Sequence, residues 1–135
     1  MFLRIALTGL TALSLSACSG EEGVPPAYRS LAVPAAHLES AAARRRGRRL
    51  YMERCAICHG ERADGRGLRH SLSSDPRDFT SRVWRQRTSP RHAFAVIREG
   101  VPGTAMPAWP SLDDGEIWDL VAYVLSVAEE GAALE

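Results

Sequence analysis

The sequence predicts an all-α domain in which about three main helices are joined by long loops. Two segments, residues 89–100 and 111–129, carry apolar side chains at helical spacing, and residues 38–54 consist largely of strong helix formers. No segment alternates between polar and apolar residues as a half-buried strand does. A length of 135 residues suits one such domain rather than two.

The first 17 residues have the pattern of a signal peptide. A short, weakly positive start precedes the apolar residues 5–17, which are too few to span a bilayer as a helix. The segment ends in LSAC, which resembles the bacterial lipoprotein box, in which the cysteine becomes the first residue and carries a diacylglycerol. Ordinary secretion with a stray cysteine is the alternative. We expect Cys18 to be lipidated and the protein to be attached on the periplasmic side of a bacterial membrane, with Ser19 favouring the outer membrane in a host that has one.

Residues 18–37 are expected to form a flexible, lipid-anchored tether. They are rich in Gly and Pro and show little periodicity. Such a tether would reach at most ~65 Å when stretched and about 25 Å as a coil. The folded domain would then occupy residues 38–130, with a C-terminal tail at residues 131–135.

The first expected helix is strongly basic. All 17 basic residues of the chain are Arg, and five of them surround Gly47 in this helix, at positions 44, 45, 46, 48 and 49. They form either a solvated helix face or a docking patch for an acidic partner or anionic headgroups. The formal net charge of +1 gives no argument for a nucleic-acid partner.

The next expected helix, residues 89–100, has clear ends. Ser89 is expected at the N-cap and Pro90 at the first helical position, with Gly100 after the last turn. Before it, residues 60–88 are rich in loop residues, with a short helical turn expected near residues 81–87.

The last helix follows a loop, residues 101–110, that carries three prolines and therefore must be rigid and non-helical. Ser111 and Asp114 predict a capping box at the start of this helix.

The motif CAICHG at residues 55–60 carries the chemistry. A disulfide, half of a zinc site, a thiol redox couple and a haem attachment site all begin with such a cysteine pair. Once Cys18 is lipidated, only Cys55 and Cys58 remain, too few for a four-cysteine zinc site. A structural disulfide needs no histidine after it, and a thioredoxin-like couple needs strands. The spacing therefore predicts a haem c held by two thioether bonds, with His59 as an iron ligand.

The sixth position of the iron needs a second ligand, for which the candidates are Met52, Met106, His37, His70 and His92. Met52 lies too close to Cys55 and would be on the same side as His59. The three histidines fall in the tether, in a flexible loop and, as an exposed polar residue, in the first turn of a helix. Met106 lies in a proline-rich loop that Pro107 stiffens, and its thioether is a soft ligand that suits iron. We expect His59 and Met106 to be the axial ligands.

Taken together, residues 41–127 resemble the class I c-type cytochromes. The pieces that carry the resemblance are GRRLY before CAICHG, DGRG after it, PRDFT, IREGVPGTAMPAW and EIWDLVAYVLS. The last two are especially similar to the small monohaem domains found as the third subunit of some haem–copper oxidases. The resemblance implies three to four helices around one covalently attached haem, with the first and last helices crossing at Gly47. In a helix interior, glycine costs ~1 kcal/mol relative to alanine, so Gly47 also calls for a packing reason of this kind.

The resemblance also implies the rest of the haem pocket. A carbonyl from a proline-containing loop is expected to accept the second N–H of His59, with Pro76, or a residue just before it, as the nearest candidate. Further pocket residues, expected to include donors to the haem propionates, are Arg66, Arg77, Trp84 and Trp109.

The expected function is that of a one-electron carrier and not an enzyme. With both axial positions filled, no iron position is open to a substrate. The expected partners are an upstream quinol-oxidising complex or dehydrogenase and a downstream oxidase or reductase on the same membrane. The alternative is a peroxidase-like haem enzyme or a gas-binding protein with a labile sixth ligand. A permanently docked subunit of a respiratory complex is a third possibility.

Overall fold

The computed structural model describes residues 23–69 and 71–132 of the chain. The expected signal peptide, the lipidation site Cys18 and the candidate ligand His70 lie outside the described residues.

The described residues are helical and contain no β-strand, so the predicted all-α class is confirmed. The elements, in chain order, are the 3-10 helix η1 (Pro26–Tyr28) and the α-helices α1 (Ala35–Glu39), α2 (Ala41–Arg54), α3 (Ala56–His59), α4 (Arg82–Arg87), α5 (Pro90–Glu99) and α6 (Asp114–Ala132). None of the helices in this part of the chain is both long and apolar enough to cross a membrane.

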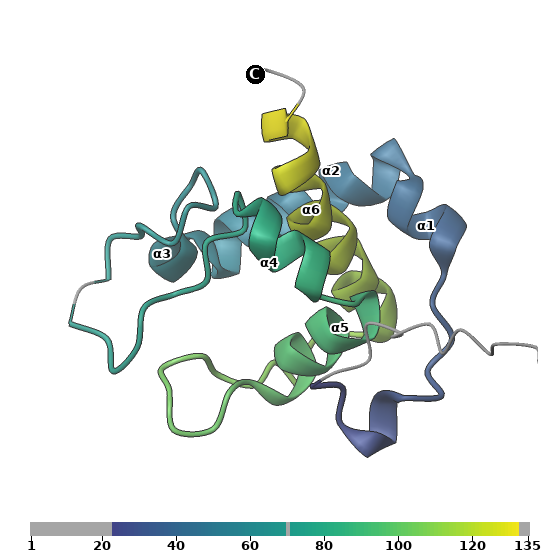
Figure 1. The fold of residues 1–135 in the computed structure, drawn as a ribbon, viewed down its shortest axis with the longest axis horizontal. Coiled ribbons are helices and arrows are strands. Elements are labelled where there is room, and N and C mark those ends of the chain that lie inside the picture. Colours follow the sequence, from purple (N-terminus) through teal and green to yellow (C-terminus); the bar gives the residue numbers. More distant parts are fainter. Residues whose placement is uncertain (1–22, 70, 133–135) are drawn as a thin grey trace, which may run out of the picture.

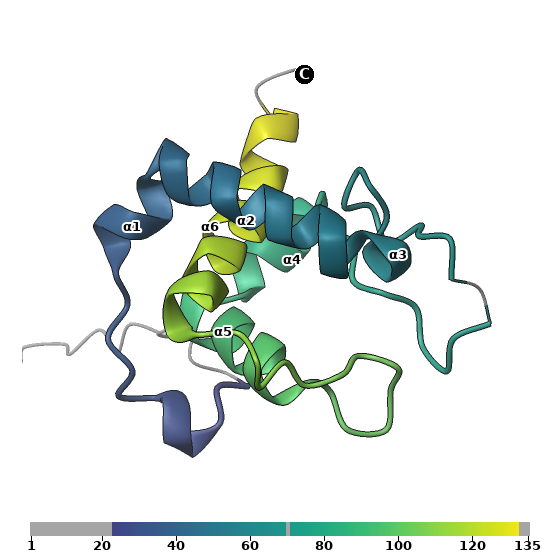
Figure 2. The ribbon, with the colours of Figure 1, turned by 180° about the vertical axis from the view of Figure 1, so that it is seen from behind.

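The crossing of α2 and α6 is the framework of the fold (Figures 1 and 2). Gly47 is buried at the crossing, and a Cβ atom built on it would lie 1.9 Å from the carbonyl oxygen of Asp119. Only glycine therefore lets the two backbones approach this closely, which is the packing reason that the sequence suggested. Tyr51, one turn further along α2, is fully buried, and its ring centroid lies 5.1 Å from that of Tyr123.

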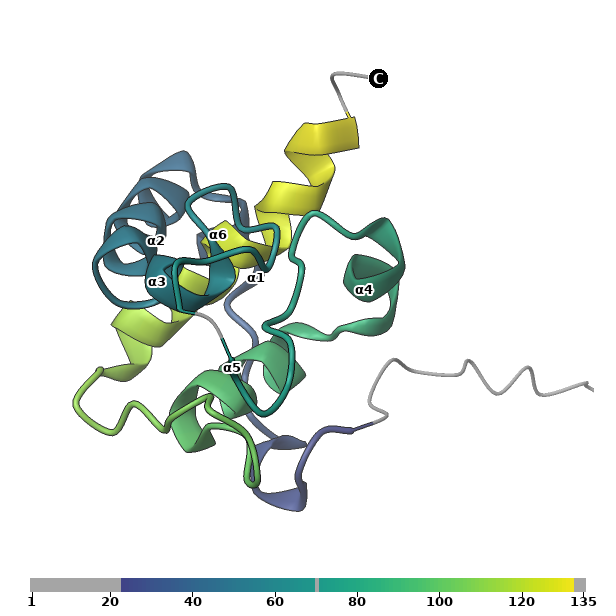
Figure 3. The same cartoon turned by 90° about the vertical axis from the view of Figure 1, so that its left-hand side faces the viewer.

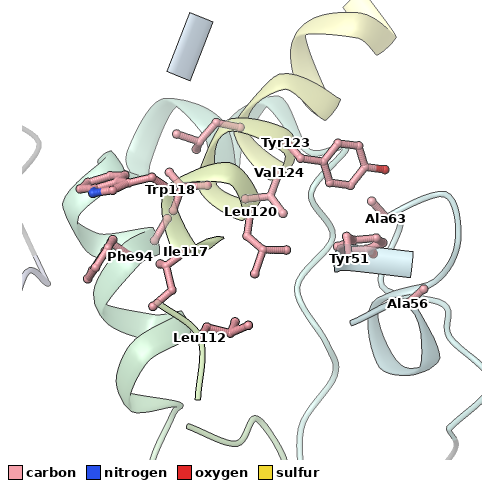
Figure 4. Close-up of a cluster of buried hydrophobic side chains, with 13 residues drawn as sticks. Tyr51, Ala56, Ala63, Phe94, Leu112, Ile117, Trp118, Leu120, Tyr123 and Val124 are labelled. Carbon is pink, nitrogen blue, oxygen red and sulfur yellow. The ribbon is translucent and has the colours of Figure 1, made fainter. Parts of the chain in front are cut away.

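Helix α6 is the centre of the hydrophobic core. Ile117, Leu120 and Val121 are at most 2% exposed, and Figure 4 shows the buried cluster around them. Helix α2 covers one side of α6, while α4 and α5 cover the other (Figures 1 to 3). On the α5 side, the rings of Phe94 and Trp118 pack with centroids 4.7 Å apart.

The helix expected at residues 38–54 begins later than predicted. Ser40 is extended, with a ψ of 121°, and separates α1 from α2. Its side-chain oxygen accepts a hydrogen bond from the backbone N–H of Ala43 at 3.4 Å, so Ser40 is the N-cap of α2. Serine caps helices because its hydroxyl satisfies an N–H that has no partner within the helix.

The predicted capping box of the last helix is also at the wrong residues. The box is formed by Asp113 and Glu116 instead of Ser111 and Asp114: Asp113 Oδ1 accepts from the N–H of Glu116 at 2.8 Å, and Glu116 Oε2 accepts from the N–H of Asp113 at 3.0 Å. The last helix also continues to Ala132, past its predicted end at residue 129, whereas the predicted ends of α5 hold. Ser89 caps α5 by accepting from the N–H of His92 at 3.2 Å, and Gly100 ends it with a φ of +70°.

Residues 23–40, which we call the N-terminal extension, pack against the helices. We expected residues up to 37 to form a free tether, but Val24 is only 2% exposed and Tyr28 packs on Phe94 with ring centroids 6.0 Å apart. The packed part of the chain thus begins near Gly23 and not at residue 38.

A buried carboxylate ties the extension to α2 and α6. Asp119 accepts two hydrogen bonds from Arg46, at 2.7 and 2.8 Å, and lies 2.8 Å from Nε2 of His37. Its side chain is 8% exposed, so these partners compensate a charge that is largely removed from water. The basic stretch of α2 is therefore not uniformly solvated, because Arg46 has a structural partner.

Candidate functional site

A large cavity is lined by residues of α3, of the loop after α5 and of α6. Its volume is about 990 Å³, at the upper end of the ~300–1,000 Å³ that small-molecule and cofactor sites occupy. The wall is predominantly apolar, and Leu120 and Val124 of α6 form part of it. Cys55, Cys58, His59 and Met106 all line this one cavity. These four residues come from the two segments that the sequence singled out.

The two cysteines are presented by the junction of α2 and α3. Cys55 ends α2 with an N–H that donates to the carbonyl of Tyr51 at 2.8 Å, and α3 then begins at Ala56. Both cysteines are free of disulfides and half-buried. Burial, more than any neighbouring charge, raises the pKa of Cys55 to about 11, so its sulfur carries a proton at neutral pH.

The imidazole of His59 is oriented by two contacts. Its Nδ1 lies 3.1 Å from the carbonyl oxygen of Arg77, and its ring stacks on that of Phe79 with centroids 4.8 Å apart. Because a carbonyl only accepts, Nδ1 carries the proton and Nε2 keeps its lone pair. Burial lowers the pKa of His59, which favours the neutral ring that a metal needs. The predicted acceptor, Pro76 or a residue before it, was wrong by one position: the carbonyl belongs to Arg77, while Pro76 lines the cavity.

The loop after α3 satisfies the last carbonyls of that helix. The N–H groups of Gly65, Gly67 and Arg69 donate to the carbonyls of His59, Cys58 and Ile57, at 2.8, 3.1 and 3.0 Å. At Gly67 a Cβ atom would lie 2.4 Å from the carbonyl oxygen of Ile57, so a side chain would push this loop away. The glycines of DGRG therefore let this loop lie directly against the CxxCH segment, and its hydrogen bonds hold that segment in place.

The loop that carries Met106 is closed by its own hydrogen bonds. The N–H of Val101 donates to the carbonyl of Met106 at 3.1 Å, and Thr104 Oγ1 accepts from the N–H of Met106 at 3.1 Å. Gly100 lies beneath the loop, where a Cβ atom would come within 2.7 Å of the Met106 carbonyl oxygen. These contacts hold Met106 at the cavity wall on a short, rigid loop.

The remaining predicted residues divide into two groups. Arg77, Trp84 and Trp109 line the cavity, whereas Arg66 is not part of the lining and is exposed to solvent. Of the alternative ligands among the described residues, His37 binds Asp119 outside the cavity.

His92 differs from the expectation of an exposed polar residue. It is half-buried, lines the cavity and has its Nδ1 3.0 Å from the carbonyl oxygen of Gly23.

Sequence reasoning missed Arg54 as a residue of the site. Its guanidinium lies 5.9 Å from the centroid of the Trp109 ring, and both side chains line the cavity. The positions of the two residues in the sequence indicate their place in the site: Arg54 directly precedes Cys55, and Trp109 closely follows Met106. This cation–π contact joins the two segments that carry the predicted ligands.

The residues present fit a covalently held haem. The cavity has the size and apolar wall of a cofactor site, two thiols and a correctly oriented imidazole at one wall, and a thioether at another. Within the described part of the chain, no group of three or more His, Cys, Asp or Glu could hold a metal ion by itself.

Comparisons with known proteins show the family of the chain. The sequence model of the family described as cytochrome c oxidase, cbb3-type, subunit III matches residues 42–124. Among solved structures, the chain is similar to a reducing HAO-like protein complex of Kuenenia stuttgartiensis, with a TM-score of 0.52 and 28% sequence identity. That similarity covers 62% of this chain but only 41% of the other. No curated protein sequence matches the chain significantly.

Proposed function

Because the chain belongs to the cytochrome c oxidase, cbb3-type, subunit III family of c-type cytochromes, we propose that it is a one-electron carrier with one haem c in the cavity between α3 and the Met106 loop. The observation that carries the proposal is the convergence of Cys55, Cys58, His59 and Met106 on one apolar cavity. Haem c supplies a one-electron Fe(III)/Fe(II) couple, whose potential depends on the axial ligands and on burial.

Each of these residues has a distinct role in the proposal. The thiols of Cys55 and Cys58 hold the cofactor covalently, which matters because a small domain cannot bury a loose haem completely. His59 binds through Nε2, since its Nδ1–H is engaged by the carbonyl of Arg77. Met106 supplies a neutral sulfur that cannot be removed by protonation. With His59 and Met106 both bound to the iron, no iron position would be left for a substrate.

The protein is proposed to work at a bacterial membrane. Cys18 would carry the lipid, and the domain would lie on the periplasmic side, between a quinol-oxidising complex or dehydrogenase and a terminal oxidase or reductase. The similarity to a chain of a reducing HAO-like complex supports a role beside other redox proteins. Co-purification from detergent extracts separates a fixed subunit of such a complex from a tethered shuttle.

The rival function is that of a haem enzyme or gas-binding protein with a labile sixth ligand. The two differ in the oxidised absorption spectrum. We expect the weak far-red band of Met–Fe(III) ligation and a low-spin spectrum, whereas a high-spin spectrum would favour the rival. Mass spectrometry of the mature protein tests the cofactor and the anchor together, because it reports both haem addition and acylation of Cys18.

A further inference from the structure

We propose that the packing of the N-terminal extension leaves only a short leash between Cys18 and Gly23, which holds the domain against the membrane with the face formed by η1 and the first turn of α5 toward the lipid headgroups. The inference rests on lipidation of Cys18, which is part of the proposed function. The extension lies before residue 42, where the family match begins, so it is an addition to the family unit.

The beginning of the extension is fixed to the domain. The carbonyl oxygen of Gly23 lies 3.0 Å from Nδ1 of His92, so Nδ1–H donates to it from the first turn of α5. The next residue, Val24, is 2% exposed, and its carbonyl accepts from Nε of Arg29 at 3.3 Å. The leash therefore ends at Gly23, where the chain enters the packed structure.

Contacts further along the extension follow the whole length of α5. Leu31 accepts a hydrogen bond from Nε of Arg91 at 2.7 Å near the start of the helix. Tyr28 packs on Phe94 with ring centroids 6.0 Å apart, and its hydroxyl binds the carboxylate of Glu99 at the end of the helix. Because these contacts are spread along α5, the extension and the helix move as one body.

The length of chain outside the structure sets the distance to the membrane. Only five peptide steps separate Cys18 from Gly23, and five residues span at most ~18 Å. A small domain is about 30 Å across. A leash shorter than the domain cannot let it turn over, so the face around Gly23 must stay toward the lipid.

The chemistry of this face suits a bilayer surface. Pro25, Pro26, Ala27 and Arg29 are exposed there. The carboxylate of Glu99, which lies nearby, is engaged by the Tyr28 hydroxyl. A guanidinium among small apolar residues fits the headgroup region of a bilayer.

The leash also places the cofactor site close to the membrane. His92, which binds Gly23, lines the cavity as well. The wall of the cavity is therefore one side chain away from the point where the leash joins the domain. This geometry fits redox partners embedded in the same membrane better than partners that diffuse in solution.

The test uses the full-length lipidated protein on vesicles of neutral and anionic phospholipid that carry a fluorophore on the headgroup. Haem quenches nearby fluorophores by energy transfer, which falls steeply with distance. A flexible Gly/Ser spacer of about ten residues, inserted directly before Gly23, adds up to ~35 Å of reach. We expect this variant to lose most of the quenching. The same spacer added after Glu135 is the matched control and should leave the quenching unchanged.

A second variant breaks the docking without lengthening the chain. Val24→Asp places a charge at a buried position, so the start of the extension should detach and the quenching should fall toward that of the spacer variant. An unchanged haem spectrum shows that the domain is still folded. Equal quenching with and without the spacer before Gly23 would overturn the leash while leaving the electron carrier intact. Failure of the wild type to co-float with vesicles would overturn the lipid anchor and the leash together.

Discussion

Gly47 and Asp119 pack backbone against backbone where α2 crosses α6. A Cβ atom on Gly47 would lie 1.9 Å from the carbonyl oxygen of Asp119 and 2.5 Å from its carbonyl carbon. No side chain can rotate out of the way, because both neighbouring atoms belong to the backbone of a buried helix. The close crossing of α2 and α6 therefore depends on this glycine.

The first prediction follows from this contact. Gly47→Ala gains ~1 kcal/mol in helix propensity but should separate the helices, with overpacking costs of ~1–3 kcal/mol or more. We expect a net loss of about 2 kcal/mol in the free energy of unfolding, measured by denaturant titration. Gly115→Ala is the control, since a Cβ there would meet only a side-chain oxygen of Asp113 at 3.2 Å. Equal free energies of unfolding for the two variants would contradict the close contact between α2 and α6 at Gly47.

The second prediction concerns the buried carboxylate of Asp119. Arg46→Ala removes two of its hydrogen bonds and leaves only the contact with His37. We expect a loss of about 1–3 kcal/mol in the free energy of unfolding, because a largely buried charge loses its main partner. Arg45→Ala should cost less than ~0.5 kcal/mol, since Arg45 is exposed and makes no hydrogen bond to any described carboxylate. A similar loss in both variants would mean that the overall charge of α2, and not the pairing of Arg46 with Asp119, contributes to the free energy of unfolding.

The third prediction tests the sixth ligand. Met106→Ala should abolish the far-red band of the oxidised protein and lower the midpoint potential, because thioether ligation favours the reduced iron. The shift should be a substantial part of the ~0.8 V range that axial ligands cover. Met52→Ala, a half-buried methionine on α2, should keep both the band and the potential. Loss of the band in the second variant alone would reassign the ligand.

The fourth prediction concerns the contact between Arg54 and Trp109. If it restrains the Met106 loop, Arg54→Ala should let added imidazole displace the methionine more easily. A cation–π contact of ~0.5–1 kcal/mol corresponds to a two- to five-fold change in imidazole affinity. Arg87→Ala removes a charge from the same cavity wall without removing an aromatic contact, and should have little effect. In a double-mutant cycle with Trp109→Leu, additive effects would show that the two side chains are not coupled.

The parts of the fold that the sequence predicts are those fixed by local chemistry. Ser89, Pro90 and Gly100 mark the ends of α5 because capping, a preset φ and a positive φ depend on the residues themselves. The spacing of Cys55, Cys58 and His59 likewise indicates its chemistry without a structure. The prediction that Gly47 faces another helix is confirmed by its contact with the backbone of Asp119. It could be made from the sequence because a glycine among strong helix formers needs a tertiary reason.

The parts that the sequence does not predict depend on tertiary contacts. Ser111 looks like an N-cap, but Leu112 is buried at 3% exposure and its N–H donates to the carbonyl of Trp109, so a turn there delays the helix to Asp114. The acceptor for His59 depends on how a long loop folds, which no local rule sets. The proline-containing extension is typical of a linker, and its contacts with α5 and with Asp119 of α6 show otherwise.

The packed extension has a practical consequence for anyone who trims the protein. A version that starts at residue 42, where the family match begins, lacks Val24, Tyr28 and His37. Such a truncation uncovers part of the Phe94 ring and removes one partner of Asp119. A soluble form intended for spectroscopy should therefore retain everything from Gly23 onward, even though sequence profiles place the domain boundary well downstream.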